Sequence, residues 1–178
     1  MNNIDEKEII QRVKAGETDC FALLVDRYGD RVFSLIFRIT GVREDAEELT
    51  QDVFLKVYEK IGSYRGDSAF ATWLYRITYN QAISKTRKKK YERPVEDETF
   101  FNHTESSTSD HDPEKEKKFI AIEKALQMLT GQERILIEMY YYQEKSVEEL
   151  AQISGLSESN VKVRLFRIRK KIYDRITI

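Results

Sequence analysis

Apolar residues recur at intervals of three and four along most of the chain, which predicts amphipathic helices. Glycines that favour helix ends separate the first of these segments, at Gly16, Gly29, Gly41 and Gly62. We predict an all-α fold with helices at residues 5–15, 19–29, 31–40, 43–61 and 68–91, followed by 114–129, 132–142, 147–153 and 158–175.

A polar segment divides the chain. Residues 94–116 have few apolar side chains, a centre rich in Ser, Thr and Asp, and both prolines of the chain. This composition predicts a flexible acidic linker. We therefore expect two small helical domains, at residues 1–93 and 117–178, joined by residues 94–116.

Charge is segregated along the chain, although the formal net charge is only −1. Six cations and one acid lie between Lys85 and Arg93, and seven cations and one acid lie between Lys162 and Arg175. The predicted linker between these patches is acidic. Two separated basic patches suit two contacts with one long DNA target, because neutralising phosphates releases counterions.

The number of cysteines and the length of apolar segments indicate the cellular compartment of the protein. Cys20 is the single cysteine, which excludes an internal disulfide and favours a reducing cytoplasm. We find no signal-like start and no apolar run near 18 residues. These features predict a cytoplasmic protein with no direct membrane insertion.

Residues 146–171 have the pattern of a helix-turn-helix. Ser146 and Glu149 form a capping-box pattern, Gly155 suits a sharp turn, and Ser157 is a good N-cap for the next helix. In that helix an apolar stripe leaves the opposite face polar and basic. Helix-turn-helix proteins lay such a face in the major groove of DNA, although a solvated basic helix is the alternative. The predicted outward face comprises Ser159, Asn160, Lys162, Val163, Phe166, Arg167 and Lys170.

The predicted helix at 68–91 follows a short polar loop, and Asp67 or Ser68 is expected to cap it. One side carries an apolar arc that includes Phe70 and Ile77, which we expect in the core, and Trp73 lies at its border. A polar arc, next to the apolar one, holds Arg76, Asn80, Ser84 and Arg87. An aromatic beside amides and cations suits unstacked bases of single-stranded DNA, whereas aromatics at helical spacing often belong to a core.

Three segments together resemble a known family. GDSAFATWLYRITYN, the upstream AEELTQDVFLKVY and the helix-turn-helix occur in the order and spacing of extracytoplasmic-function (ECF) RNA polymerase sigma factors of the sigma-70 family. The resemblance implies a region 2 domain that binds the polymerase clamp and opens the promoter −10 element. It also implies a region 4 domain that reads the −35 element, contacts with the clamp and flap of core RNA polymerase, and an anti-sigma factor as a further partner.

The resemblance also assigns roles to residues. The core-binding positions are Glu48, Gln51, Asp52 and Leu55. The −10 positions are Tyr64, Arg65, Gly66, Asp67, Ser68, Trp73, Arg76 and Asn80, which the polar arc extends to Ser84 and Arg87. In the recognition helix, Lys162, Val163, Phe166 and Arg167 match −35 positions, and Val163 and Asn160 depart from the residues common in the family.

No constellation of catalytic residues is apparent, so we expect neither an enzyme nor a cofactor. His103 and His111 lie in the predicted linker without a cysteine pair or rigid helical spacing, and we predict no metal site there. Two alternatives remain. A stand-alone helix-turn-helix regulator would bind specific DNA without polymerase, and a protein-binding adaptor would show no DNA specificity.

Overall fold

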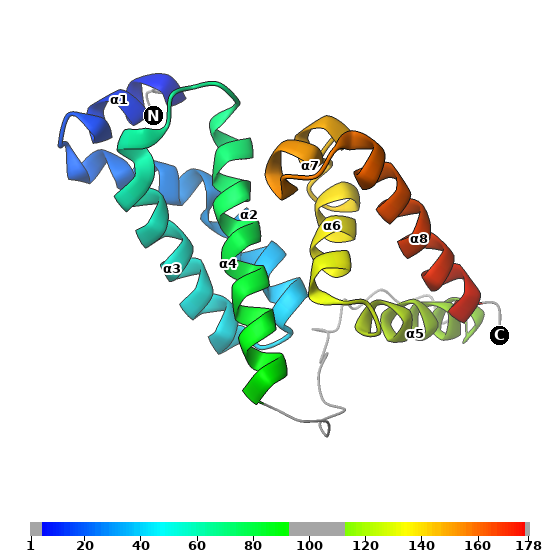
Figure 1. Ribbon diagram of the computed structural model, residues 1–178. Coiled ribbons are helices and arrows are strands. Elements are labelled where there is room, and N and C mark those ends of the chain that lie inside the picture. Colours follow the sequence, from blue (N-terminus) through cyan, green and yellow to red (C-terminus); the bar gives the residue numbers. More distant parts are fainter. Residues whose placement is uncertain (1–4, 93–112, 177–178) are drawn as a thin grey trace.

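The computed structural model describes residues 5–92 and 113–176, and all regular elements within these ranges are helical (Figure 1). This confirms the all-α prediction. The N-terminal half comprises α1 (Glu6–Lys14), η1 (Thr18–Cys20), α2 (Phe21–Thr40), α3 (Arg43–Lys60), η2 (Ile61–Ser63) and α4 (Phe70–Glu92). The C-terminal half comprises α5 (Pro113–Gln127), α6 (Gly131–Tyr141), α7 (Val147–Ser154) and α8 (Glu158–Ile176). Most of the predicted linker, with His103 and His111, lies outside the described residues.

The predicted helix break at Gly29 is wrong, because α2 runs through it from Phe21 to Thr40. A glycine inside a helix costs only about 1 kcal/mol relative to alanine. Here Tyr28 and Val32 on either side are buried, so tertiary packing outweighs that cost. The break at Gly41 is confirmed, since this residue has φ of 70° and its N–H donates to the carbonyl of Phe37 at the end of α2.

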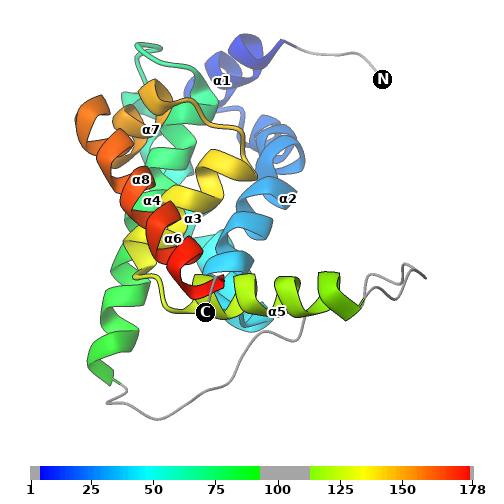
Figure 2. The same ribbon diagram turned by 90° about the vertical axis from the view of Figure 1, so that its right-hand side faces the viewer.

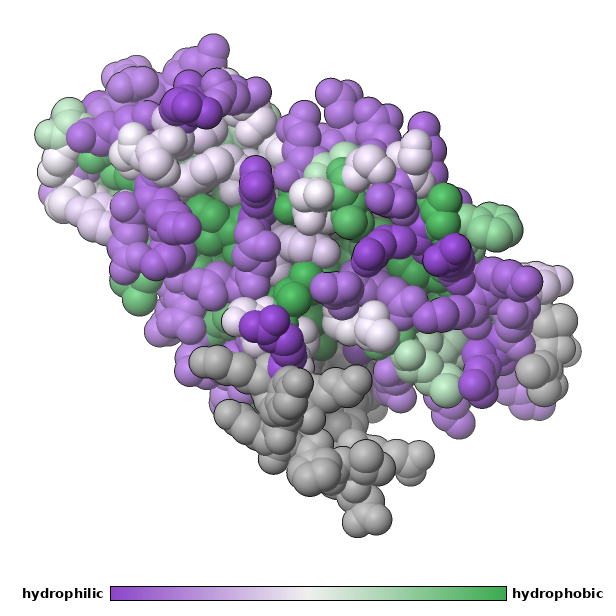
Figure 3. All heavy atoms as spheres, viewed as in Figure 1, coloured by the Kyte–Doolittle hydropathy of each residue, from purple (hydrophilic) through white to green (hydrophobic). Residues whose placement is uncertain are grey.

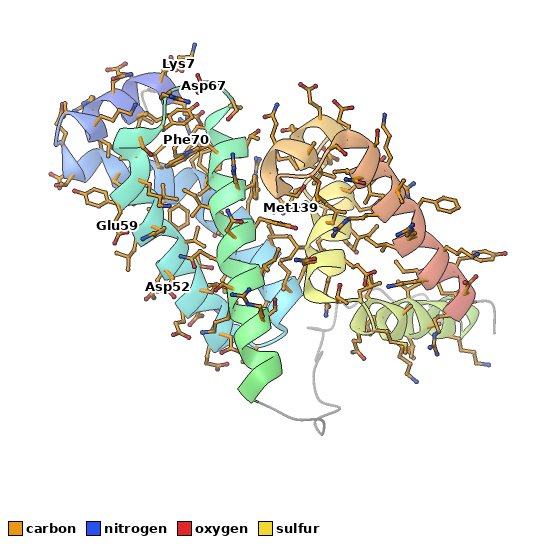
Figure 4. All side chains as sticks on the ribbon, in the orientation of Figure 1. Lys7, Asp52, Glu59, Asp67, Phe70 and Met139 are labelled. Carbon is orange, nitrogen blue, oxygen red and sulfur yellow. The ribbon has the colours of Figure 1, made fainter. Side chains whose placement is uncertain are left out.

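The N-terminal half is a bundle around α2. Apolar side chains of α2 and α3, among them Leu24, Leu35 and Val53, are fully buried. Phe70 at the start of α4 is 1% exposed and lies between α3 and α4 in Figure 4, which confirms that it is a core residue. This packing leaves the opposite face of α3 and one side of α4 free for other contacts.

Two helices of the C-terminal half begin with capping boxes. Thr130 and Glu133 form a capping box at α6, and Ser146 and Glu149 form one at α7. Helix α5 packs along α8, and α6 lies between α7 and α5 in Figure 1.

The two halves are packed together. Helices α6 and α7 contact α4, and α6 also contacts α2. Turning the molecule by 90° shows α6, α7 and α8 in front of α3 and α4, in agreement with these contacts (Figure 2). Met139 of α6 is fully buried, and Figure 4 places it between α6 and α4. The buried side chains of both halves therefore form one continuous apolar cluster.

Within the part of the chain that the structure describes, no helix has the length and apolarity needed to cross a membrane.

Candidate nucleic-acid and polymerase interfaces

The local hydrogen bonds of the helix-turn-helix agree with the pattern in the sequence. The backbone N–H of Glu149 donates to Ser146 Oγ (3.1 Å), and the N–H of Ser146 donates to Glu149 Oε2 (2.9 Å). Gly155 has φ of 73° and ends α7. The N–H of Asn160 then donates to the hydroxyl of Ser157 (3.3 Å) at the start of α8. The predicted capping box, turn glycine and N-cap are all confirmed.

Helix α8 is divided into a buried and an exposed face. Val161, Leu165 and Ile168 are at most 2% exposed, so they fix the rotation of α8 against the other helices. Its solvent-facing side includes two apolar residues, Phe166 at 66% exposure and Val163 at 45%. Every residue of the predicted −35 set is exposed, namely Ser159, Asn160, Lys162, Val163, Phe166, Arg167 and Lys170.

The loop before α4 is held by its own contacts. Gly66 has φ of 82°, which favours glycine, and the Tyr64 hydroxyl donates to the carbonyl of Ser68 (2.6 Å). Lys14 of α1 also donates to the carbonyl of Tyr64. These hydrogen bonds hold the loop between α3 and α4 in a defined conformation. The loop lies at the top of Figure 1.

The prediction that Asp67 or Ser68 caps α4 is wrong. The Asp67 carboxylate instead accepts a 3.1 Å hydrogen bond from Arg65 Nε, and the Ser68 hydroxyl lies 3.5 Å from the carbonyl of Ala69. Helix α4 begins at Phe70, so the residue that precedes it is Ala69, whose side chain has no hydrogen-bond acceptor. Figure 4 shows Asp67 at the outer edge of this loop.

Trp73 lies at the border between core and surface, as its place on the helix predicts. Its ring packs against Tyr64 (5.3 Å between centroids) and Phe70 (5.7 Å), and it is half-buried. Ile77 is also partly buried against the core. Along the neighbouring arc of α4, Arg76, Asn80 and Arg87 are exposed and Ser84 is half-buried. The structure thus places an aromatic, a cation and an amide, Trp73, Arg76 and Asn80, in the first turns of α4 after the loop, with Arg87 farther along the helix.

A cavity of about 250 Å³ opens next to Trp73. Its lining includes Asp67, Ser68, Thr72 and Arg76 from the N-terminal half, and Gln152 from α7. Gln152 is absent from the residues that the sequence pattern predicts, since it reaches this place only through packing of the two halves.

The predicted polymerase-binding residues lie on the solvent side of α3. Glu48, Gln51 and Asp52 are exposed, and Leu55 is 63% exposed; Figure 4 shows Asp52 on the outer side of this helix. Two features escaped the sequence analysis. Tyr58 is 42% exposed and extends the apolar part of this face. It lies three residues beyond Leu55, a spacing that places both side chains on the same side of a helix, so the sequence pattern could have identified it.

The second feature is an ion pair between α3 and α4. Lys85 Nζ lies 2.6 Å from Glu48 Oε2, and this hydrogen bond raises the pKa of Lys85. One carboxylate of the predicted polymerase-binding face is therefore joined to the helix that carries most of the predicted −10 residues. The partners are 37 residues apart, so no local pattern identifies them.

Among residues 5–92 and 113–176, no group of three or more histidine, cysteine, aspartate or glutamate residues is placed to hold a metal ion.

An exposed basic helix of a capped helix-turn-helix, together with an aromatic and cationic face on a second domain, defines a class of DNA-reading regulatory proteins. The comparisons are more specific. The family model described as sigma-70 region 2 matches residues 24–91, and the model described as sigma-70, region 4 matches residues 119–172.

Full-length relatives agree with these matches. The chain is 31% identical to the ECF RNA polymerase sigma factor SigW of Bacillus subtilis (strain 168), with 94% of this chain and 97% of the relative covered. It is 30% identical to the ECF RNA polymerase sigma-E factor of Escherichia coli (strain K12), with 97% and 95% covered. It is 28% identical to the RNA polymerase sigma-H factor of Pseudomonas aeruginosa, with 94% and 91% covered.

Solved structures share the fold over nearly the whole chain. CnrH in complex with the cytosolic domain of CnrY is similar with a TM-score of 0.66 and 20% identity, covering 93% of each chain. RpoE in complex with the anti-sigma factor NepR from Bartonella quintana has a TM-score of 0.68 and 22% identity, covering 89% of this chain and 97% of that one. The chain belongs to the ECF sigma factors of the sigma-70 family, the transcription initiation factors that direct RNA polymerase to promoters.

Proposed function

We propose that this sigma factor divides promoter recognition between its two halves, with α8 reading the −35 element and the loop before α4, together with α4 itself, opening the −10 element. The observation that carries the proposal is the two-faced character of α8. Its buried stripe leaves the predicted −35 residues together in solvent.

The exposed face of α8 has the chemistry needed for duplex readout. Cations such as Lys162 and Arg167 suit phosphates or the acceptor edge of guanine, and Asn160 near the start of the helix suits adenine. Phe166 and Val163 offer apolar contact with a thymine methyl group. We propose that this face lies in the major groove of the −35 element.

The α4 face suits single-stranded DNA. Unstacking a base costs a few kcal/mol, which stacking and hydrogen bonds in a pocket must offset. Trp73 supplies a ring at the edge of a cavity, Asn80 an amide, and Arg76 and Arg87 cations for the backbone. We propose that these residues, with Ser84 and the loop Tyr64–Ser68, capture the melted −10 strand.

The solvent side of α3 is the proposed docking surface for the polymerase clamp. Glu48, Gln51 and Asp52 supply polar contacts, and Leu55 with Tyr58 supplies an apolar centre. Region 4 would contact the polymerase flap. Because both similar structures that share the fold are complexes with CnrY and NepR, we also propose that an anti-sigma factor binds this chain. We also propose that the protein is not an enzyme and that it acts in the cytoplasm.

Promoter variants test the division of labour. With core polymerase and this protein, a scrambled −35 element is expected to weaken binding of closed duplex, whereas a scrambled −10 element should leave binding and abolish strand opening. Arg167→Ala should then show no further loss on the scrambled −35 template. An additional loss there would contradict the assignment of α8.

A further inference from the structure

Helix α1 lies outside the segment that the sigma-70 region 2 model matches, since that match begins at residue 24. The helix is nevertheless part of the N-terminal bundle, because Ile9, Ile10 and Val13 on its inner side are at most 6% exposed. It also contacts η2, which ends directly before the loop that precedes α4. Helix α1 therefore lies next to the loop that we assign to the −10 element.

A side chain of α1 bonds to this loop. Lys14, in the last turn of the helix, donates a hydrogen bond to the backbone carbonyl of Tyr64, which lies 50 residues further along the chain. Its Nζ also lies 5.7 Å from the centre of the Tyr64 ring, within the range of a cation–π contact. A hydrogen bond from a charged donor is roughly twice as strong as one between neutral groups. Lys14 thus holds both the backbone and the ring of Tyr64.

Tyr64 connects this hydrogen bond to Trp73. The Tyr64 ring packs edge-on against Phe70, with 5.5 Å between centroids, and lies 5.3 Å from the Trp73 ring. Its hydroxyl donates to the carbonyl of Ser68 at the other end of the loop (2.6 Å). Phe70 is 1% exposed and fixed in the core, whereas Trp73 is half-buried. A displacement of Tyr64 would therefore move the loop and the Trp73 ring together.

The opposite end of α1 is fixed to α2. Glu6 accepts a hydrogen bond from the Tyr28 hydroxyl, and its Oε2 lies 3.6 Å from Arg27 Nη1. Burial raises the pKa of Tyr64, and the charge of Glu6 adds to that rise, so Glu6 also lies near the Tyr64 ring. Helix α1 is held at its start by α2 and along its length by buried residues. Its last turn is thus a fixed point from which Lys14 reaches the loop.

The loop itself is open to solvent. The side chains of Arg65 and Asp67 are 83% and 75% exposed. Figure 4 shows Lys7 of α1 and Asp67 at the same end of the molecule, and Figure 3 shows a mainly hydrophilic surface there. A segment with few buried contacts opens easily unless specific bonds hold it. The hydrogen bond from Lys14 is such a bond, and it comes from an element outside the loop.

We propose that Lys14 is a positioning residue for strand opening, which holds the loop and the Trp73 ring in the arrangement that receives an unstacked base. The proposal rests on the proposed function of the loop and α4. A surface that is ordered before binding loses less conformational freedom when it captures a ligand. Lys14 acts through Tyr64, without a contact to DNA of its own. Its loss should weaken capture of the melted strand and leave duplex recognition by α8 and docking by α3 unchanged.

The fluorescence of Trp73 tests the positioning role in the free, full-length chain. Trp73 is the single tryptophan of the sequence, so the emission reports this site alone. Lys14→Met keeps an apolar stem of similar length and removes the charge and the donors. We expect its emission to shift to longer wavelength and its quenching by acrylamide to increase, because the Tyr64 ring no longer packs firmly on Trp73. Lys14→Arg retains a charged donor and should restore the wild-type values.

Strand opening is then measured with core polymerase. Permanganate reactivity of thymines in the −10 element should fall about three- to tenfold with Lys14→Met, the loss expected for one charge-assisted hydrogen bond. Competition binding to core polymerase and binding to closed duplex should not change, and Lys14→Arg should restore opening. The matched control is Arg12→Met, which removes a cation from the same helix whose side chain pairs with Glu17. It should alter neither Trp73 fluorescence nor opening.

Far-UV circular dichroism shows whether the variants are folded. If Lys14→Met loses helix, Lys14→Gln, which keeps an uncharged donor, takes its place in the same comparison. Unchanged quenching of Trp73 would overturn the positioning role, and so would normal strand opening despite altered fluorescence. An equal loss of core affinity would also overturn it, since the effect would then lie in docking. Wild-type holoenzyme that opens no promoter would contradict the proposed function instead, because the fluorescence is read without polymerase or DNA.

Discussion

The carboxylate of Glu138 on α6 lies 3.9 Å from the guanidinium of Arg38 on α2, across the contact between the two halves of the chain. Burial raises the pKa of Glu138, and the charges of Arg38 and Arg134 oppose the rise. Attraction to two arginines thus falls short of the cost of desolvating the carboxylate.

Glu138→Gln is therefore expected to stabilise the protein at neutral pH. Because the pKa is raised on folding, the contribution of Glu138 to stability is fully present below its ordinary value near 4.5 and is lost as pH rises through the raised value. The glutamine is neutral throughout, so the variant should have the higher Tm at pH 7, and the difference should shrink toward pH 4.5. Thermal unfolding across this range measures both.

Glu59→Gln is the control for this experiment. The hydrogen bond from Lys56 lowers the pKa of Glu59, the opposite direction. Its replacement should bring no stabilisation at pH 7. A lower Tm for Glu138→Gln at pH 7 would show that the ion pair outweighs desolvation.

Arg167→Ala should weaken recognition of the −35 element. Loss of a base contact costs about 1–3 kcal/mol, or roughly 5- to 150-fold in affinity. Binding of the holoenzyme to duplexes with intact and scrambled −35 elements measures the loss. Arg175→Ala, also exposed but in the last turn of α8, should have a much smaller effect. Unchanged output from a −35-dependent template would remove Arg167 from the recognition face.

Asn80→Ala should impair strand opening while sparing polymerase binding. The amide is exposed on α4 about two turns after Trp73, a position from which we expect it to reach an unstacked base. Permanganate reactivity of thymines in the −10 element should fall several-fold. Asn160→Ala makes the same change on α8 and should reduce duplex binding instead. Normal permanganate reactivity with Asn80→Ala would count against its role.

The double change Gln51→Ala/Asp52→Ala should lower affinity for core polymerase about tenfold, a loss near 1.4 kcal/mol. Competition binding against an unlabelled sigma factor gives the ratio. The matched control, Glu8→Ala/Gln11→Ala, removes one acid and one glutamine from exposed positions on α1. Full retention of affinity by the α3 variant would move the docking surface elsewhere.

Local signals in the sequence predicted the helix-turn-helix well. Ser146 with Glu149 and Gly155 define helix ends within a few residues, and the structure has the corresponding hydrogen bonds. The same reasoning failed at Gly29, where burial of neighbouring residues decides the conformation. Nor could it find the pairing of Arg38 with Glu138, because residues one hundred positions apart meet only after both halves have folded.

Part of the candidate −10 face on α4 could also be predicted from the sequence, because residues on one side of a helix recur at regular spacing. Helical spacing identified Trp73 and Arg76 as neighbours, and both line one cavity. Tyr75 and Tyr79 also recur at helical spacing, but an apolar stripe does not reveal whether its own bundle or another domain covers it. Gln152 of α7 reaches the cavity beside Trp73 only because the C-terminal half packs against α4.

Run-off transcription from a genomic promoter library, using purified core polymerase with and without this protein, tests the central claim most directly. We predict discrete new start sites only when the protein is added, and alignment of these starts should reveal both promoter elements. Absence of new starts, with specific duplexes still retarded by the protein alone, would contradict the account and favour a stand-alone regulator.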